Sequence, residues 1–286
     1  LMNLKHPLFV DFKLGMRSEG EYGYRLDDGP YFITWPLVYV LKKTGVTPNQ
    51  ICLLSFLSGT VFLAGLLQNY PLTNHYLLIL LLGLRILFDC IDGQHARYSR
   101  QTTNLGALYD LAADFVFTVL LFITLTYLLI VQNRVEPLLA ILICLIAFLS
   151  FVVTATVHSY LVLLQESTEL PPLVIKERFM SSLPDDCPQS PAYTRKLNLF
   201  NRLFGVTWRP VSLVVTSVLR KNIPQKNMVF LLHSLSLTEY GMHLVILWVI
   251  VLTGSPLLYF LIFEIILFGL TIILLSPYIQ VRTTVN

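Results

Sequence analysis

Hydrophobic residues along this chain form long uninterrupted stretches, separated by short polar connections and by one long polar segment. Six windows of about 19 residues or more are almost free of charge, so each could cross a hydrocarbon core of roughly 30 Å as a helix. They are residues Gln50–Gln68, Thr73–Tyr98, Asn104–Val131, Pro137–Gln165, Met228–Leu252 and Pro256–Leu275. The pattern predicts an all-α, polytopic membrane protein with six transmembrane helices.

The segments outside these windows predict the remaining organisation. Residues Pro30–Lys43 are apolar and aromatic but too short to cross, so we expect an amphipathic helix that lies at the membrane interface. Thr47–Gln50 combines an N-cap, a proline at the first helical position and a capping-box glutamine, which predicts a helix start. We therefore expect an N-terminal cytoplasmic segment over residues 1–46 and a six-helix domain over 47–286. Within that domain, residues 166–227 hold seven prolines and nine Lys or Arg, which predicts a basic cytoplasmic loop.

Charge is scarce in this chain. Only 13% of the 286 residues are Asp, Glu, Lys or Arg, against about 25% in soluble domains, and 55% are hydrophobic. These values exclude an ordinary soluble protein, and a net charge of +3 argues against a nucleic-acid partner. Lys and Arg fall almost entirely on one side of the predicted membrane, with Arg134 alone on the other. The positive-inside rule therefore predicts that both termini face the cytoplasm.

Six carboxylates lie inside the predicted spans, where each costs roughly 2.5–3.5 kcal/mol on insertion scales and therefore suggests a function. Four of them gather at neighbouring helix ends. Asp89 and Asp92 are three residues apart on the second span, and Asp110 and Asp114 are four apart on the third, so each pair shares one helix face. Because a short turn joins these spans, we expect the two pairs to meet.

Four carboxylates at close range would repel one another strongly, so a cation is expected between them. Arg85, the one basic residue well inside a span, and Arg97 could neutralise part of the charge. The ligand set consists of oxygens, without Cys or an obligatory His, and this favours hard divalent ions such as Mg²⁺ or Mn²⁺. Two ions would balance four carboxylates, and a two-metal site suits displacement at phosphorus. The four cysteines show no pairing pattern and are expected to be unpaired core or loop residues.

The residues around the acids fit a diphosphate ligand. Gly93 and Ala96 leave the face of the second span bare, Arg97 supplies a forked phosphate donor, and Gly106 opens the facing helix. From Asp89 to Asp114 the chain reads Asp-x₂-Asp-Gly-x₂-Ala-Arg-x₈-Gly-x₃-Asp-x₃-Asp. This is, without departure, the motif of the CDP-alcohol phosphotransferase family, also called the CDP-alcohol phosphatidyltransferase family. The chain closely resembles that family, and its predicted spans and interfacial helix are similar too.

The resemblance implies a phospholipid-synthesis enzyme that moves a substituted phosphate from a CDP-linked donor to an alcohol hydroxyl and releases CMP. Asp89, Asp92 and Asp110 would be metal ligands for two Mg²⁺ or Mn²⁺ ions. Asp114 would be the general base and would also touch the second ion. The cytidine diphosphate site would be formed by Asp92, Gly93, Ala96, Arg97 and Gly106. The resemblance also implies a homodimer in the lipid bilayer. The predicted orientation places the four aspartates, and with them the active site, on the cytoplasmic side.

The acceptor alcohol is the least defined part of this interpretation. The third to sixth spans hold no Lys or Arg in their cores, but they do hold Glu239, His243 and Glu264. These residues could form an acidic wall for an amine-bearing acceptor such as serine, ethanolamine or choline. The alternative is that they are buried residues, with a Glu paired to His243 or to a hydroxyl.

The donor also has an alternative. The compact chain favours CDP-diacylglycerol as the donor, with an aminoalcohol phosphotransferase that uses CDP-choline or CDP-ethanolamine and diacylglycerol as the second possibility. Leu111 stands where that subgroup tends to have His, and Phe115 where inositol-type enzymes often have Arg. A cation-coupled transporter is a remote non-enzyme alternative. It would place acids near the membrane midplane and would show an internal repeat, whereas the four aspartates lie toward one face of the predicted membrane and no repeat is visible.

Overall fold

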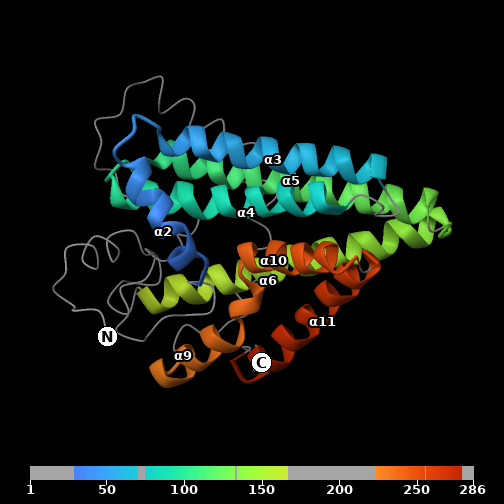
Figure 1. Ribbon diagram of the computed structural model, residues 1–286. Coiled ribbons are helices and arrows are strands. Elements are labelled where there is room, and N and C mark those ends of the chain that lie inside the picture. The colour runs from blue at the N-terminus through green and yellow to red at the C-terminus, as the bar shows by residue number, and fades with distance from the viewer. Residues whose placement is uncertain (1–28, 70–74, 133, 167–222, 255, 279–286) are drawn as a thin grey trace, which may run out of the picture. The chain divides into compact units, whose positions relative to one another are not determined.

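A computed structural model describes residues 29–69, 75–132, 134–166, 223–254 and 256–278, and every regular element in these ranges is a helix (Figure 1). The predicted all-α class is therefore confirmed for the described part of the chain. The long helices are α2 Gly29–Leu41, α3 Pro48–Asn69, α4 His75–Tyr98, α5 Asn104–Val131, α6 Pro137–Glu166, α9 Gln225–Ser234, α10 Tyr240–Leu252 and α11 Leu258–Leu275. Most of the predicted basic loop and of the N-terminal segment lies outside the described residues.

Local side-chain chemistry fixes where the helices of the motif region begin. The Gln50 side-chain oxygen accepts a hydrogen bond from the Thr47 backbone N–H at 2.9 Å, which is one half of the predicted capping box at the start of α3. Thr103 is the N-cap of α5, and its hydroxyl accepts from the Gly106 N–H at 3.0 Å. The turn between α4 and α5 is therefore short, since α4 ends at Tyr98 and α5 begins at Asn104. Both helices, which carry the two halves of the motif, pack against α3.

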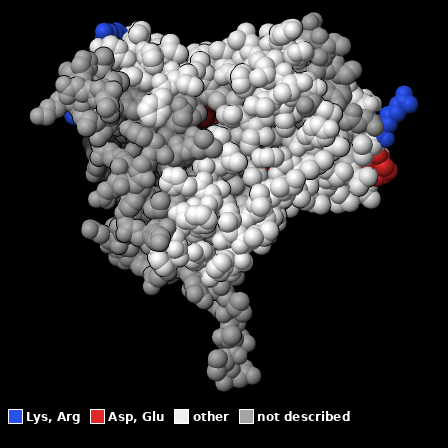
Figure 2. Space-filling model, turned by 60° about the horizontal axis from the view of Figure 1, so that its bottom comes forward, with Lys and Arg blue, Asp and Glu red and all other residues white. Residues whose placement is uncertain are grey.

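Four segments among the described residues are long and apolar enough to cross a membrane: Pro48–Gln68, Tyr109–Val131, Pro137–Val162 and Leu258–Tyr278. The predicted second span is also one continuous helix, α4, but it carries Arg85, Asp89, Asp92 and Arg97, so its hydropathy is interrupted. The total of six transmembrane helices stays a prediction. Among the residues that are not grey in Figure 2, charged side chains on this face are few, as expected for a protein surrounded by lipid.

The predicted fifth span, Met228–Leu252, is wrong as a single helix. It is divided into α9, the 3₁₀ turn η2 (Ser236–Thr238) and α10, with Glu239 in an extended conformation between them. Short polar side chains bond the local backbone at this break: Ser236 donates to the His233 carbonyl and Thr238 donates to the Leu235 carbonyl. Such bonds compete with the helical ladder, whereas a hydropathy average hides them.

The predicted interfacial helix Pro30–Lys43 is present as α2, and it packs against α4. Val38 of α2 joins Ile51 of α3 and Ile91 and Tyr98 of α4 in one buried apolar cluster. The Thr34 hydroxyl also donates to the side-chain oxygen of Gln94 at 2.8 Å. These contacts fix α2 against the end of α4 that carries the motif. Its position at a membrane surface stays a prediction.

The chain divides into two units, each with its own packing. The first comprises residues 1–144 and 244–257, and within it α3 packs against both α4 and α5 (Figure 1). The second comprises residues 145–243 and 258–286. Its core joins α6, α9 and the end of α11 through Val157, Tyr160, Leu161, Met228, Leu231, Leu232, Leu235 and Leu275. The aspartate motif lies wholly in the first unit, whereas Glu239, His243 and Glu264 lie in the second.

Candidate active site

The four motif aspartates converge, as their spacing predicted. One carboxylate oxygen from each of Asp89, Asp110 and Asp114 lies within 4.8 Å of the others, so α4 and α5 share a cluster that could hold a cation. Asp92 belongs to a second group with Asp110 and the thiol of Cys52, also within 4.8 Å of one another. Asp110 belongs to both groups, so the structure joins the two carboxylate pairs of the motif into one continuous site.

Arg85 supplies positive charge directly to this site. Its guanidinium donates to Asp89 at 2.8 Å, one helical turn along α4, and also to Asp114 on α5. Arg85 is only 1% exposed, and its guanidinium lies 5.2 Å from the centre of the Phe117 ring. The sequence suggested that Arg85 neutralises part of the acidic charge. The structure confirms this and shows that the residue links α4 to α5.

Arg85 also contacts α3, where Gly59 makes its position possible. The Arg85 guanidinium donates to the Ser55 hydroxyl, and that hydroxyl donates to the Arg85 backbone carbonyl at 2.9 Å. A Cβ atom on Gly59 would lie 2.8 Å from the Phe117 ring and 3.1 Å from the Arg85 Cδ. The absence of a side chain at residue 59 therefore allows α3 to approach the ring and the arginine together.

The residues expected to bind a diphosphate lie about one helical turn from the motif aspartates along α4 and α5. A Cβ on Gly93 would be 3.3 Å from Nη1 of Arg97, so the bare glycine leaves the space that this guanidinium occupies. The Arg97 guanidinium also lies 5.3 Å from the centre of the Tyr31 ring of α2. Ala96 is partly buried one residue before Arg97. Their role towards a nucleotide stays a prediction.

Gly106 permits a close approach of α3 to the first turn of α5. A Cβ at this position would be 2.9 Å from the Thr103 hydroxyl oxygen and 3.2 Å from the Asn49 side-chain oxygen. The Asn49 amide thus reaches the start of α5 from the first turn of α3. The space beside Gly106 is used by Thr103 and Asn49 of this chain, and the expected role of Gly106 towards a ligand stays a prediction.

The contribution of α3 is what the sequence did not single out. Asn49, Cys52, Ser55 and Gly59 recur at intervals of three or four residues, so they form one stripe of small and polar side chains on an apolar helix. Two of them approach motif residues, Asn49 at Gly106 and Cys52 at Asp110, and Ser55 bonds to Arg85 beside the motif. The spacing of polar residues on α3 could have indicated this face, although none of its members is charged.

The chemistry of the site fits divalent cations. The Asp92 side chain is 5% exposed, and its Oδ2 has no hydrogen-bond donor among the described residues. A buried carboxylate oxygen without a donor is costly unless a cation neutralises it. The oxygens of Asp89, Asp110 and Asp114 form a ligand set that hard ions such as Mg²⁺ or Mn²⁺ prefer.

The three residues predicted to line an acceptor pocket are engaged with one another or with the backbone. His243 and Glu264 are both fully buried, and Nδ1 of His243 lies 2.9 Å from a Glu264 carboxyl oxygen. The Glu239 carboxylate accepts from the Met242 N–H at 3.2 Å and caps the start of α10. Glu264 is therefore the buried partner of His243 that the alternative interpretation expected. A role in acceptor binding stays a prediction.

Comparison with known proteins agrees with the motif. Residues 45–173 match the model of the CDP-alcohol phosphatidyltransferase family. The chain is also similar to phosphatidylinositol phosphate synthases of Mycobacterium tuberculosis (strain ATCC 25618 / H37Rv) and Mycobacterium bovis (strain BCG / Pasteur 1173P2). Each is 31% identical over 130 residues, which cover 45% of this chain and 55% of the relative. The chain thus spans just over half the length of these curated relatives, and no solved structure matches it. The residues that match the CDP-alcohol phosphatidyltransferase family model contain the complete aspartate motif, so the similarity to this family covers the candidate site.

Proposed function

We propose that this chain is a membrane-embedded phosphotransferase of phospholipid synthesis, which transfers a substituted phosphate from a CDP-linked donor to an alcohol and releases CMP. The observation that carries the proposal is the convergence of Asp89, Asp92, Asp110 and Asp114 on one site in a helical membrane protein. Carboxylates at this density serve to hold divalent cations, and paired cations suit displacement at phosphorus. The family match over residues 45–173 supports the same reaction class.

Asp89, Asp92, Asp110 and Asp114 would hold two Mg²⁺ or Mn²⁺ ions. When bound, these ions would neutralise the diphosphate oxygens of the donor and stabilise the charge that develops on them. Arg97 would donate to the same diphosphate, since its forked guanidinium matches phosphate oxygens. Gly93, Ala96 and Gly106 would leave the space that the cytidine diphosphate needs.

Asp114 would accept the proton of the acceptor hydroxyl, because it is the motif carboxylate farthest along α5 from the turn that joins α4 and α5. The acceptor oxygen then forms a bond to the phosphorus that carries the donor's alcohol group. The bond from that phosphorus to the bridging oxygen breaks, and the electron pair leaves with CMP. Arg85 would hold Asp114 in place through its guanidinium. Asp114 is fixed in this way by a residue outside the family motif.

CDP-diacylglycerol is the donor that we favour, and the phosphatidyl group is then what is transferred. The curated relatives are named phosphatidylinositol phosphate synthases, which supports a phosphatidyl product. The pairing of His243 with Glu264 leaves fewer free charges for an acidic acceptor wall than the sequence suggested. Transfer of phosphocholine or phosphoethanolamine to diacylglycerol is the second candidate. The cytoplasmic orientation of the site and a homodimeric assembly are part of the proposal.

Direct measurement of CMP release tests the reaction class and both donors. Purified full-length chain would be incubated with labelled CDP-diacylglycerol and a panel of alcohols, and separately with CDP-choline or CDP-ethanolamine and diacylglycerol. We expect CMP in the first set only with Mg²⁺ or Mn²⁺ present, and none in EDTA. Release in the second set alone would reverse the choice of donor. Release in EDTA at the full rate, or no CMP from any pair, would contradict the proposed function.

A further inference from the structure

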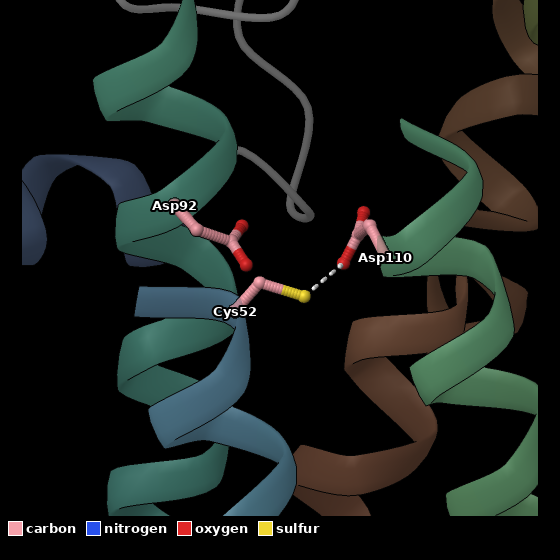
Figure 3. Close-up of side chains that lie close together, drawn as sticks. All are labelled: Cys52, Asp92 and Asp110. Atoms are coloured by element: carbon pink, nitrogen blue, oxygen red, sulfur yellow. Dashed lines mark hydrogen bonds between the residues drawn. The ribbon is translucent and has the colours of Figure 1, made fainter. Parts of the chain in front are cut away.

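A thiol reaches the carboxylate cluster from a third helix. Cys52 lies on α3, and its Sγ is 4.0 Å from Oδ1 of Asp110 on α5. One oxygen of Asp92 on α4 completes the group, since the three potential ligand atoms all lie within 4.8 Å of one another (Figure 3). The sequence predicted Cys52 to be an unpaired core residue. In the structure it lies beside two of the proposed metal ligands.

Asp92 supplies an independent reason to expect a cation in this second group. Its Oδ2 is buried and has no hydrogen-bond donor within the described ranges, and the whole residue is 5% exposed. Figure 3 shows the Asp92 carboxylate directed toward Cys52 and Asp110. A cation bound between Asp92, Cys52 and Asp110 would neutralise the buried oxygen.

The distance between the Cys52 sulfur and the Asp110 oxygen agrees with the bond lengths of a borderline or soft cation. Zinc–sulfur bonds are about 2.3 Å and zinc–oxygen bonds about 2.0–2.2 Å, so one ion can join a sulfur and an oxygen up to about 4.4 Å apart. The distance of 4.0 Å between Cys52 and Asp110 falls within that reach. Mg²⁺ prefers an octahedron of oxygens and gains little from a thiol, whereas Zn²⁺ and Cd²⁺ accept mixed sulfur and oxygen ligands.

We propose that Cys52, Asp92 and Asp110 form a binding site for a borderline or soft divalent cation such as Zn²⁺ or Cd²⁺. This site shares Asp110 with the oxygen-only group of Asp89, Asp110 and Asp114. A cation held by the thiol therefore competes for a ligand with the ions that would support transfer, and micromolar Zn²⁺ inhibits CMP release. Only this inhibition rests on the proposed function, because the binding itself requires no substrate.

Cadmium binding to the full-length protein without substrates tests the site. Cd²⁺ alone would be titrated into the purified chain while the thiolate-to-cadmium charge-transfer absorbance is recorded. We expect a band that saturates near one equivalent in the wild type. Cys52→Ser should remove the band and weaken Cd²⁺ binding at least about tenfold, because even the loss of an outer-shell partner of a ligand typically costs about 10- to 100-fold in metal affinity. Cys90→Ser is the matched control, because Cys90 is also a partly buried cysteine, on α4, and this variant should keep the band.

A second variant guards against misfolding of Cys52→Ser. Asp92→Asn retains the thiol but removes a ligand charge. The charge-transfer band should therefore still form at high Cd²⁺, while the affinity for Cd²⁺ falls about tenfold or more. A band of unchanged affinity in both variants, or no band in the wild type, overturns the proposal. These readouts are separate from turnover. Cadmium binding without CMP release would contradict the proposed function alone, and CMP release without the cadmium band would contradict this inference alone.

Discussion

The contacts of Arg85 explain how the negatively charged carboxylates of the cluster can lie close together. It is 1% exposed and donates to Asp89 and Asp114, which are themselves about one-fifth exposed. A buried arginine that bridges two carboxylates is neutralised by them, and it in turn reduces the repulsion between them. The carboxylates can therefore lie close together before any metal ion binds.

Replacing Arg85 should destabilise the fold in a way that a divalent cation partly corrects. Arg85→Met removes the charge from a buried network, and we expect a loss of about 3 kcal/mol in the free energy of unfolding. Mg²⁺ should then raise the unfolding temperature of the variant more than that of the wild type, because the ion supplies the missing charge. Thermal unfolding in detergent, with and without Mg²⁺, measures both effects.

Arg85→Lys is the matched control for this prediction. It keeps the charge, but a single ammonium group cannot reproduce the forked contacts to two carboxylates and a hydroxyl. We expect an intermediate stability and an intermediate response to Mg²⁺. An equal Mg²⁺ response in the wild type and both variants would show that Arg85 does not act as a counter-charge to the cluster.

Asp114 should be essential for turnover but not for folding. Asp114→Asn retains an oxygen that can accept from Arg85, whereas the amide cannot take the proton of the acceptor alcohol. We expect the rate of CMP release to fall about 10²- to 10⁴-fold with little change in unfolding temperature. Glu136→Gln is a suitable control, since Glu136 is an exposed acid that accepts from the Leu139 N–H outside the motif. Normal turnover by the Asn variant would exclude Asp114 as the base.

At the scale of the elements, α3 is the helix that assembles the site. It packs against both α4 and α5, and its stripe of small and polar residues faces the motif. Gly59 is a point of close packing in this stripe, because a Cβ there would come within 2.8 Å of the Phe117 ring. The ring also contacts the Arg85 guanidinium, so displacement of Phe117 would reach the charged network directly.

Gly59→Ala should therefore be destabilising although alanine favours helices. We expect a loss of about 1–3 kcal/mol in unfolding free energy, because the added methyl overpacks a filled space. Gly269→Ala is the control within α11, since a Cβ there meets nothing within 4 Å. That variant should be neutral or slightly stabilising. Unfolding temperatures of the two variants compare them, and equal stability would contradict the close packing at Gly59.

The buried pair His243 and Glu264 lies beside the break between α9 and α10 and contacts it. Nε2 of His243 lies 3.2 Å from the Thr238 carbonyl, which can only accept, so this nitrogen carries a hydrogen. The pair thus joins α11 to the carbonyl at the end of the 3₁₀ turn through a single imidazole ring.

Glu264→Leu should destabilise the second unit, because it leaves a buried imidazole nitrogen without its partner. We expect a cost of about 1–3 kcal/mol in unfolding free energy. Glu264→Gln can still bond to Nδ1 and should cost clearly less. Thermal unfolding of the two variants separates these outcomes. If both variants lose stability equally, the hydrogen bond is not what the carboxyl group contributes.

At the scale of the whole molecule, the distribution of basic residues makes a prediction about orientation. Lys42 and Arg134 are both exposed and lie on opposite sides of the predicted membrane. In intact cells that express the chain, an Arg134→Cys variant should react with an impermeant maleimide from outside. A Lys42→Cys variant should react only after permeabilisation, and the wild type reports the background of native cysteines. The reverse labelling pattern would place the active site on the opposite side.

The sequence by itself determined the helical class, the start of α3 and the meeting of the four aspartates. Each depends on spacing within a helix or across a short turn, and such spacing is local. It could not reveal the break in the predicted fifth span. Ser236 and Thr238 bond to the local backbone there, and the average hydropathy of an apolar window does not register such bonds. For Glu239 and Glu264 it left two interpretations open, an acidic wall for an acceptor or buried partners of His243 or of a hydroxyl, because burial and pairing depend on contacts between helices.

Only the tertiary structure decided what α3 brings to the site. Cys52, Ser55 and Gly59 are ordinary residues in an apolar helix, and their importance comes from facing Asp110, Arg85 and Phe117 across long intervals of sequence. The acidic motif could be recognised because charge in an apolar span is costly and therefore conspicuous. A thiol or a glycine in the same span costs almost nothing, so its role becomes visible only where packing places it beside a carboxylate or a guanidinium.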